Sequence, residues 1–288
     1  MNISLENDHV IVSLQSFGGE LTSVLNKETG LEYIWQAGKE WPKHSPVLFP
    51  IVGSLKEGSY IYHDKSYSLD RHGFARTRDF EVLEQNESSV SFILKSDAAT
   101  LDVFPFPFEL IITYIIKENK LEVQYKVINT GEDEMYFSIG AHPAFKVPLN
   151  DAHAYDDYYL EFNKTETAGR WPLNNGLLEN ETVNFFNGNK TLPLKKELFA
   201  TDALVFENLF SDCISIKNNK DEHGLDFHFS NYPYFGIWAA ANADFVCLEP
   251  WYGVTDSVSS DRKLMTKNGI NKLEKNTFFT CSWSITVY

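Results

Sequence analysis

The 288-residue sequence is short of basic side chains, of cysteine and of long apolar runs. Its 25 Lys and Arg residues face 40 Asp and Glu residues, so the formal net charge is −15. A strongly acidic chain is repelled by phosphate backbones and anionic lipid, which makes nucleic acid and membrane surfaces poor partners. No apolar run reaches the roughly 20 residues that cross a bilayer. The N-terminus also lacks the basic and apolar regions of a signal peptide, so we expect a cytoplasmic protein.

Other signatures are absent as well. The three cysteines, Cys213, Cys247 and Cys281, are far apart and contain no C-x-x-C pair, which argues against a disulfide framework or a structural zinc site. The sequence has no G-x-S-x-G elbow, no phosphate-cradling G-x-x-x-x-G-K-[ST], no dinucleotide G-x-G-x-x-G and no H-E-x-x-H. We therefore expect a protein that works without a metal or another cofactor.

Aromatic residues are abundant, and strand patterns dominate the chain. The 22 Phe, 14 Tyr and 6 Trp residues favour strands, although a few of them could line a carbohydrate site. Residues 121–127 alternate apolar and polar side chains, and residues 108–116 are rich in β-branched and aromatic residues. The polar stretch between these two runs predicts a hairpin. Further short strands are predicted at residues 10–14, 90–94, 214–216, 225–229 and 278–287.

No long amphipathic helix is evident, and residues 22–27 and 195–199 are each expected to form a short turn at most. Residues 151–190 have a weak hydrophobic pattern and are expected to be long loops with short strands on the rim. Many short strands with few helices predict an all-β protein. We expect a single domain over residues 1–288, built as a large antiparallel β-sandwich.

The first segment that could carry chemistry is residues 70–78. Three of the five arginines in the chain, Arg71, Arg76 and Arg78, lie here beside His72. A guanidinium fork binds anionic or oxygen-rich ligands, so Arg71 and Arg76 are candidate substrate-binding residues. Surface ion pairs with the plentiful carboxylates would explain the cluster equally well. Strand alternation would place Arg76 and Arg78 on one face and Arg71 on the other.

The second and third segments contain a histidine and a glutamate at the ends of strand-like runs. His142 lies in residues 139–145, just before Pro143, and its ordinary pKa near 6.5 suits proton transfer. Glu249 follows four apolar residues and precedes a proline and two aromatic residues, among them Trp251. Burial would raise the pKa of Glu249 and make it a better base. A purely structural histidine, and a glutamate that is simply paired, are the alternatives.

These segments, in this order, resemble the aldose 1-epimerase (galactose mutarotase-like) superfamily, most of all its LacX-type branch. The strings His-Gly-Phe-Ala-Arg at 72–76, Gly-Ala-His-Pro-Ala-Phe at 140–145 and Cys-Leu-Glu-Pro-Trp at 247–251 carry the resemblance. It implies a β-supersandwich with a sugar-binding cleft, and an isomerase that interconverts the α and β anomers of an aldose.

The resemblance also implies roles for single residues. Glu249 matches the family's base and His142 its acid. His72 matches a substrate-binding histidine, and Asp202 an aspartate that binds sugar hydroxyls. Ring opening needs a base at the C1 hydroxyl and an acid at the ring oxygen, and we expect the two groups on opposite sides of the sugar ring.

The chain departs from the better-known galactose mutarotases at two positions. Ser54 stands where they carry a substrate-binding arginine, and Ala141 stands where they carry asparagine. Galactose therefore cannot be carried over as the substrate. Lys56 and Lys146 are candidates for the missing cation. The motif at 72–76 is also typical of hexose-6-phosphate mutarotases, so the sequence leaves a monosaccharide and a sugar phosphate open as substrate. The net charge of −15, which slows the approach of an anion, slightly favours the neutral sugar.

Three classes of function remain from the sequence. The leading hypothesis is an aldose 1-epimerase. A non-catalytic sugar-binding or sugar-sensing protein on the same fold is the alternative, although a binder has no need of an acid–base pair. A purely structural role has little support. The sequence is compatible with a monomer or a homodimer.

Overall fold

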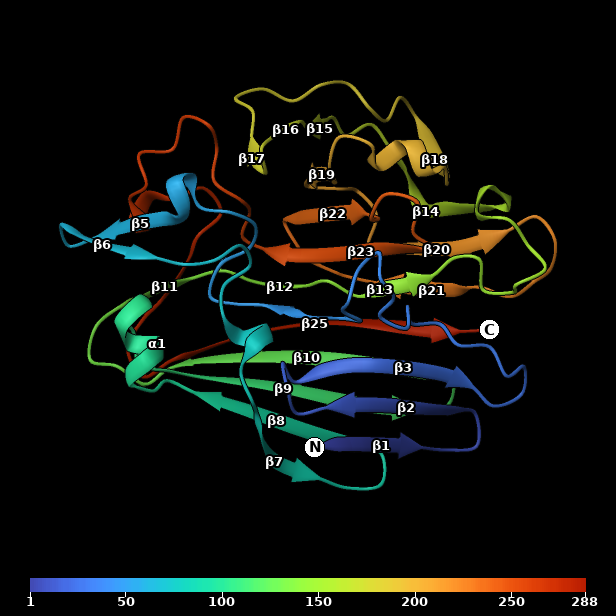
Figure 1. Ribbon diagram of the computed structural model, residues 1–288, viewed down its shortest axis with the longest axis horizontal. Helices are drawn as coiled ribbons and strands as arrows, with labels where there is room; N and C mark the ends of the chain where they lie inside the picture. Colours follow the sequence, from blue (N-terminus) through green and yellow to red (C-terminus); the bar gives the residue numbers. More distant parts are fainter.

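Antiparallel strands make up most of the protein in the computed structural model, which describes residues 1–288. They form sheets of nine, seven and three strands together with three two-stranded pairs (Figure 1). This architecture confirms the predicted all-β class and its antiparallel sheets. No helix of the structure has the length and apolar character needed to cross a membrane.

The strands fall into six sheets. In spatial order, the nine-stranded sheet consists of β18 (Asn189–Pro193), β14 (Tyr158–Glu166), β20 (Cys213–Asn218), β21 (Leu225–His228), β25 (Phe278–Val287), β10 (Lys120–Asn129), β9 (Phe108–Lys117), β8 (Ser89–Lys95) and β7 (Glu81–Gln85). The seven-stranded sheet consists of β15 (Arg170–Trp171), β19 (Leu204–Glu207), β22 (Tyr234–Trp238), β23 (Phe245–Tyr252), β12 (Ile139–Ala141) and β4 (Val47–Leu48), with β13 (Ala144–Lys146) also paired to β23. The smaller sheets are β1 (Asn2–Glu6), β2 (Val10–Gln15) and β3 (Glu20–Asn26); β5 (Ser59–Tyr62) and β6 (Lys65–Ser68); β11 (Met135–Phe137) and β24 (Asn271–Leu273); and β16 (Leu173–Asn174) and β17 (Leu177–Leu178).

Helical segments are short. The one α-helix is α1 (Ala98–Val103), and the 3-10 turns are η1 (Lys56–Gly58), η2 (Ala75–Thr77), η3 (Tyr155–Asp157), η4 (Lys196–Phe199) and η5 (Leu264–Thr266). Asp97 caps α1, because its side chain accepts the Thr100 backbone N–H at 2.7 Å while its own N–H donates to the Thr100 hydroxyl at 2.8 Å.

The β9–β10 hairpin shows why the strand predictions succeed. Every second side chain of β9 is buried, which is the burial pattern of a strand with one face on a core. Lys117 pairs with Lys120 across a tight turn, and the ladder continues to Phe108 and Asn129. The predicted hairpin is confirmed, as are the other predicted strands, which lie in β2, β8, β20, β21 and β25.

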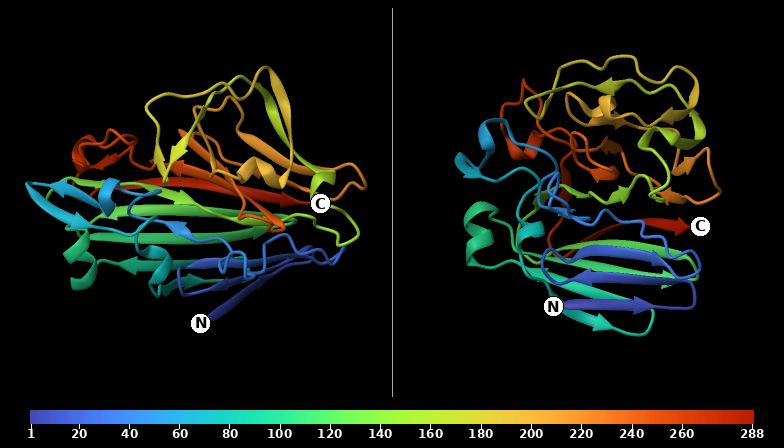
Figure 2. Two further views of the ribbon diagram at one scale, coloured as in Figure 1. Left: turned by 45° about the horizontal axis from the view of Figure 1, so that its top comes forward. Right: turned by 45° about the vertical axis from the view of Figure 1, so that its right-hand side comes forward.

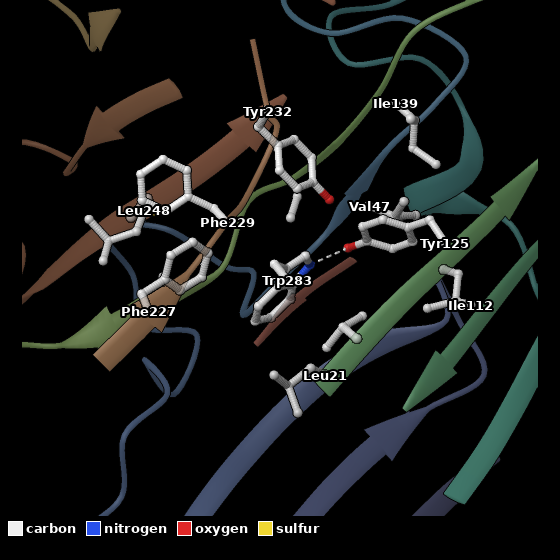
Figure 3. Close-up of a cluster of buried hydrophobic side chains, with 14 of the residues drawn as sticks. Leu21, Val47, Ile112, Tyr125, Ile139, Phe227, Phe229, Tyr232, Leu248 and Trp283 are labelled. Carbon is white, nitrogen blue, oxygen red and sulfur yellow. Dashed lines mark hydrogen bonds between the residues drawn. The ribbon is translucent and has the colours of Figure 1, made fainter. Parts of the chain in front are cut away.

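The core lies between the nine-stranded sheet and the elements that cover it. Figure 3 shows Trp283 of β25 between Phe227 of β21 and Tyr125 of β10, with Leu21 of β3 and Leu248 of β23 among the residues around them. The Trp283 indole N–H donates to the Tyr125 hydroxyl at 3.0 Å, and its ring stacks on Phe227 with centroids 5.3 Å apart. The sandwich is therefore closed by side chains from separate sheets.

The three-stranded sheet lies beside β8, β9 and β10 in Figure 1 and in the two views of Figure 2. The Tyr114 hydroxyl of β9 donates to the Gly19 carbonyl at 2.7 Å, which ties the turn before β3 to the larger sheet. The seven-stranded sheet lies on the other side of β25 in Figure 1 and supplies most of the candidate site.

One local prediction is wrong, one holds for part of its range and one is confirmed. Residues 22–27 do not form a helical turn, because Thr22 to Asn26 belong to β3. Within residues 151–190, β15, β16 and β17 are the short strands expected there. However, β14 is a nine-residue strand of the large sheet, with Tyr158, Leu160 and Phe162 buried alternately. The turn at 195–199 is present as η4. None of the three cysteines forms a disulfide; two are buried, and Cys281 is half-buried.

Candidate functional site

A cavity of about 160 Å³ brings the three singled-out segments together. Glu249 and Trp251 reach it from β23, His142 from the connection between β12 and β13, and Arg71 and His72 from the segment before η2. A larger hollow of about 790 Å³ lies over β9, β10 and β25 and is lined mostly by polar side chains. We place the candidate site in the smaller cavity, because buried ionisable groups converge there.

The alternation of β23 explains why Glu249 faces the cavity. Cys247, Glu249 and Trp251 lie on one face of this strand, and all three are buried. Opposite Glu249 on β22 is Gly236, where a Cβ atom would lie 2.5 Å from the Trp251 ring. The missing side chain therefore leaves the space that the indole fills beside the carboxylate.

His142 and Glu249 are in direct contact at the base of the cavity. The His142 Nε2 atom lies 3.4 Å from the Glu249 Oε2 atom, and both side chains are almost fully buried. Burial is the main cause that raises the pKa of Glu249 to about 8, with the charge of Arg71 opposing it. Burial, followed by the charges of Arg71 and Arg76, lowers the pKa of His142 to about 3. At neutral pH the pair therefore holds one proton.

This contact contradicts the expectation that the two groups lie on opposite sides of the sugar ring, because no ring fits between atoms 3.4 Å apart. The physical reason is simple. The C1 hydroxyl oxygen and the ring oxygen of an aldose are bonded to the same carbon. Because these two oxygens are close together, two neighbouring side chains can reach both of them from one side of the ring.

Two tryptophans that the sequence did not single out enclose His142. The Trp41 ring stacks on the imidazole with centroids 4.9 Å apart and an interplanar angle of 23°, and Trp238 packs edge-on at 5.6 Å. With Trp251, three of the six tryptophans line the cavity. Trp41 lies in the irregular segment between β3 and β4, so no periodic pattern could have assigned it.

The arginines are arranged differently from the predicted alternation, because residues 75–77 form the 3-10 turn η2 rather than a strand. Arg71 and Arg76 both line the cavity, while Arg78 turns away and lies 3.8 Å from Asp97. Arg76 donates from Nη2 to the Arg71 carbonyl at 2.7 Å, but its buried Nε–H has no partner.

Arg71 spans the edge of the cavity. Its Nη2 atom lies 3.7 Å from Asp202 Oδ1, so the predicted Asp202 reaches the site through Arg71, and the adjacent Ala203 lines the cavity itself. Arg71 and Arg76 also line an adjoining hollow of about 550 Å³. Their side chains therefore form a wall between the two spaces.

The cation that the structure brings near Ser54 is Arg71, whereas the sequence suggested Lys56 or Lys146. A Cβ atom on Gly176 would lie 3.4 Å from Ser54 Oγ and 3.6 Å from Arg71 Nη1, which places the guanidinium beside Ser54. Lys56 and Lys146 do not line the cavity. Lys56 donates to the Ser260 carbonyl, and Lys146 pairs with Asp151.

One set of side chains has the atoms of a metal site. The candidate ligand atoms of His142, Cys247 and Glu249 lie within 4.8 Å of one another, and all three residues are buried. Arg71 and Arg76 stand over the same cavity, and their positive charge opposes a cation there. The arrangement is better suited to moving a proton and holding an electron-rich ligand.

Comparison with known proteins places this site in a family. The sequence model described as "Aldose 1-epimerase" matches residues 1–263. The chain belongs to the aldose 1-epimerase family. Within it the chain is of the LacX type, since it is 35% identical to the chromosomal protein LacX of Lactococcus lactis subsp. lactis over 100% of this chain and 99% of that protein.

Solved structures of relatives share the fold of this family member. A galactose mutarotase related enzyme from Lactobacillus acidophilus superimposes with a TM-score of 0.96 at 34% identity, over 100% of this chain and 97% of that one. A galactose mutarotase-like protein from Lactobacillus casei gives a TM-score of 0.93 at 28% identity, with 100% of both chains covered. The family and these structures support a sugar-epimerase or sugar-binding role and confirm the mutarotase-like fold.

Proposed function

We propose that the protein is an aldose 1-epimerase that interconverts the α and β anomers of a hexose or hexose phosphate. The observation that carries the proposal is the buried contact between His142 Nε2 and Glu249 Oε2 at the base of a cavity lined by arginines and tryptophans. A site that only binds sugar needs hydrogen-bond donors and acceptors, whereas a buried pair that shares one proton suits general acid–base catalysis.

At neutral pH the shared proton lies on Glu249, so in the proposed reaction it first passes to His142 across their contact. Glu249 then takes the proton of the C1 hydroxyl while His142 gives its proton to the ring oxygen. The bond between C1 and the ring oxygen breaks, and an open-chain aldehyde forms. After rotation about the C1–C2 bond, closure on the other face of the aldehyde reverses both proton transfers. The pair holds one proton before and after each step, and their contact lets that proton pass directly between the two side chains.

The test is proton NMR exchange spectroscopy on glucose, galactose and their 6-phosphates, with and without the protein. Enhanced exchange between the anomers supports an epimerase and names the preferred sugar. Line broadening without enhanced exchange would favour the alternative, a non-catalytic sugar-binding protein. Neither broadening nor exchange with any of these sugars would contradict a hexose site.

The pH dependence of exchange follows from the shared proton. Because the pair must hold one proton, we expect kcat/KM to be flat from about pH 5 to 7 and to fall as the pH rises through the Glu249 pKa of about 8. Activity should also fall at the acidic end, as the pH drops through the His142 pKa of about 3 and the pair takes up a second proton. The measurement is exchange rate against pH, corrected for the uncatalysed reaction. A rate that keeps rising beyond pH 8 would show that the unprotonated pair is active.

We further propose that the preferred sugar is phosphorylated. The buried Arg76 Nε–H lacks an acceptor, and Arg71 and Arg76 flank an adjoining hollow into which a substituent of the sugar can extend. A phosphoryl group provides acceptors that match the guanidinium fork. The overall charge of −15 slows the approach of an anion, but contact with the arginines governs its binding.

Substitution of Arg76 separates the two substrate classes. We expect Arg76→Ala to raise KM for a hexose 6-phosphate roughly 10- to 100-fold, because charged hydrogen bonds to the phosphoryl group are lost. KM for the free hexose should change far less. Arg76→Lys is the control, because it keeps the charge but loses the fork, and an intermediate KM is expected. An equal loss for both sugars would indicate that Arg76 only shapes the cavity.

A further inference from the structure

Behind the cavity wall lies a buried ion pair that the proposed reaction does not use. Lys267 and Asp256 are each 3% exposed, and Lys267 Nζ lies 2.9 Å from Asp256 Oδ1. Lys267 Nζ also donates to the Val254 carbonyl at 2.6 Å. Neither side chain lines the cavity. A buried ion pair contributes little net stability compared with apolar residues of similar size, so its contacts indicate what it holds in place.

Asp256 forms two hydrogen bonds with the segment 54–56. Its Oδ2 atom accepts the Lys56 backbone N–H at 2.9 Å, and its own N–H donates to the Ser54 carbonyl at 2.9 Å. The neighbouring Thr255 adds a third bond, because its Oγ1 atom accepts the Ser54 N–H at 2.9 Å. The backbone entering this segment is therefore fixed from the side of Asp256.

Gly53 links the fixed backbone of residues 54–56 to His72. It has a φ of +72°, and a Cβ atom there would lie 2.3 Å from the Thr255 Cβ, so Gly53 lies directly against Thr255. Its backbone N–H donates to His72 Nδ1 at 3.1 Å, and its carbonyl accepts the His72 N–H at 2.8 Å. His72 thus takes its position from the Gly53 backbone.

The Gly53 contact also selects the tautomer of His72. Burial lowers the pKa of His72 well below its usual value, so the ring is neutral and has one N–H and one lone pair. A backbone N–H can only donate, so Nδ1 must carry the lone pair and Nε2 the proton. Arg71 Nε also donates to His72 Nε2, at 3.2 Å. A neutral ring has only one lone pair, so this contact competes with the Gly53 contact, and presentation of Nε2–H to a substrate requires the Arg71 contact to open.

We propose that Asp256 and Lys267 are positioning residues that hold the 53–56 segment so that His72 presents Nε2–H to the substrate. The inference deepens the proposed function and rests on it in one respect, because His72 Nε2–H can donate to a sugar oxygen only if the cavity binds sugar. Without the hydrogen bond from the Lys56 N–H to Asp256, the Gly53 N–H moves away from His72 Nδ1, and both tautomers of His72 are populated.

The test compares two substitutions that both remove the carboxylate paired with Lys267. Asp256→Asn keeps an oxygen that can accept the Lys56 N–H, whereas Asp256→Leu has a similar shape and no acceptor. The readout is the ¹⁵N chemical shifts of the His72 ring in the full-length protein at pH 7, assigned by their loss in His72→Gln. We expect a single Nε2–H tautomer in the wild type and in Asp256→Asn, and mixed tautomers in Asp256→Leu.

Kinetics give the second readout. Asp256→Leu should raise KM about tenfold, the value of one lost hydrogen bond, with a smaller change in kcat. A folded Asp256→Leu protein with the wild-type tautomer and KM would overturn the inference. Mixed tautomers in both Asp256→Leu and Asp256→Asn would also overturn it. If Asp256→Leu does not fold, Lys267→Met decides instead: mixed tautomers support the inference, and an unchanged His72 spectrum overturns it.

The ring shifts require no turnover, so failure of this inference is distinct from failure of the proposed function. Dependence of the tautomer on Asp256 without any anomer exchange would leave the positioning role intact and reject the epimerase. Anomer exchange together with a His72 tautomer that does not depend on Asp256 would support the epimerase and reject the positioning role.

Discussion

Glu249→Gln should slow catalysed anomer exchange by about 10²–10⁴-fold, and His142→Asn should do the same. Each substitution keeps a polar side chain but removes the group that takes or gives the proton; Glu249→Gln also keeps the shape, whereas Asn is smaller than the imidazole of His142. Because the two side chains touch at 3.4 Å and share one proton, the double variant should be only slightly worse than either single variant. The measurement is exchange spectroscopy on the preferred sugar.

A matched control comes from a carboxylate far from the cavity. Glu161 of β14 pairs with Lys217 on the nine-stranded sheet, so Glu161→Gln makes the same chemical change outside the site. We expect it to leave the exchange rate within about twofold of the wild type, as for most surface substitutions. If Glu249→Gln and His142→Asn are as active as this control, the assignment of the acid and the base is wrong.

Trp283→Ala should lower the free energy of unfolding by about 3–5 kcal/mol, the range for a large aromatic residue removed from a core. Trp283 is 2% exposed and packs among side chains from several sheets (Figure 3). The loss combines the transfer of its apolar surface with a cavity that neighbouring strands cannot close. Urea unfolding followed by circular dichroism measures it.

Tyr125→Phe separates packing from hydrogen bonding at the same place. It keeps the ring but removes the acceptor of the Trp283 indole N–H, which leaves a buried donor without a partner. We expect a loss of about 1–3 kcal/mol, smaller than for Trp283→Ala. A loss below about 1 kcal/mol for Trp283→Ala would mean that the surrounding strands collapse into the space.

Much of the fold can be predicted from the sequence, because the alternation of apolar and polar side chains along a strand is a local property. Residues 121–127 alternate without a break, and the structure places them in β10 with Leu121, Val123 and Tyr125 buried. The same reasoning fails where a loop-like composition hides the pattern. The asparagines around β14 obscured the alternation of Tyr158, Leu160 and Phe162.

The site was predicted in part for the same reason. His72, His142 and Glu249 lie in ordered motifs, and the structure brings all three to one cavity. The faces of Arg76 and Arg78 were wrong, because a 3-10 turn rotates successive side chains by about a third of a turn rather than half. Trp41 and Trp238 were missed, because no linear spacing relates them to His142.

The sequence by itself determined the all-β class, the family resemblance and the residue types available for proton transfer. Strand periodicity and short motifs are written in neighbouring residues. Only the tertiary structure decided that His142 touches Glu249, that Arg71 stands beside Ser54, and that a buried Asp256 holds the backbone behind His72. These contacts join residues far apart in the chain, and they are set by how the sheets pack and which side chains can share the space between them.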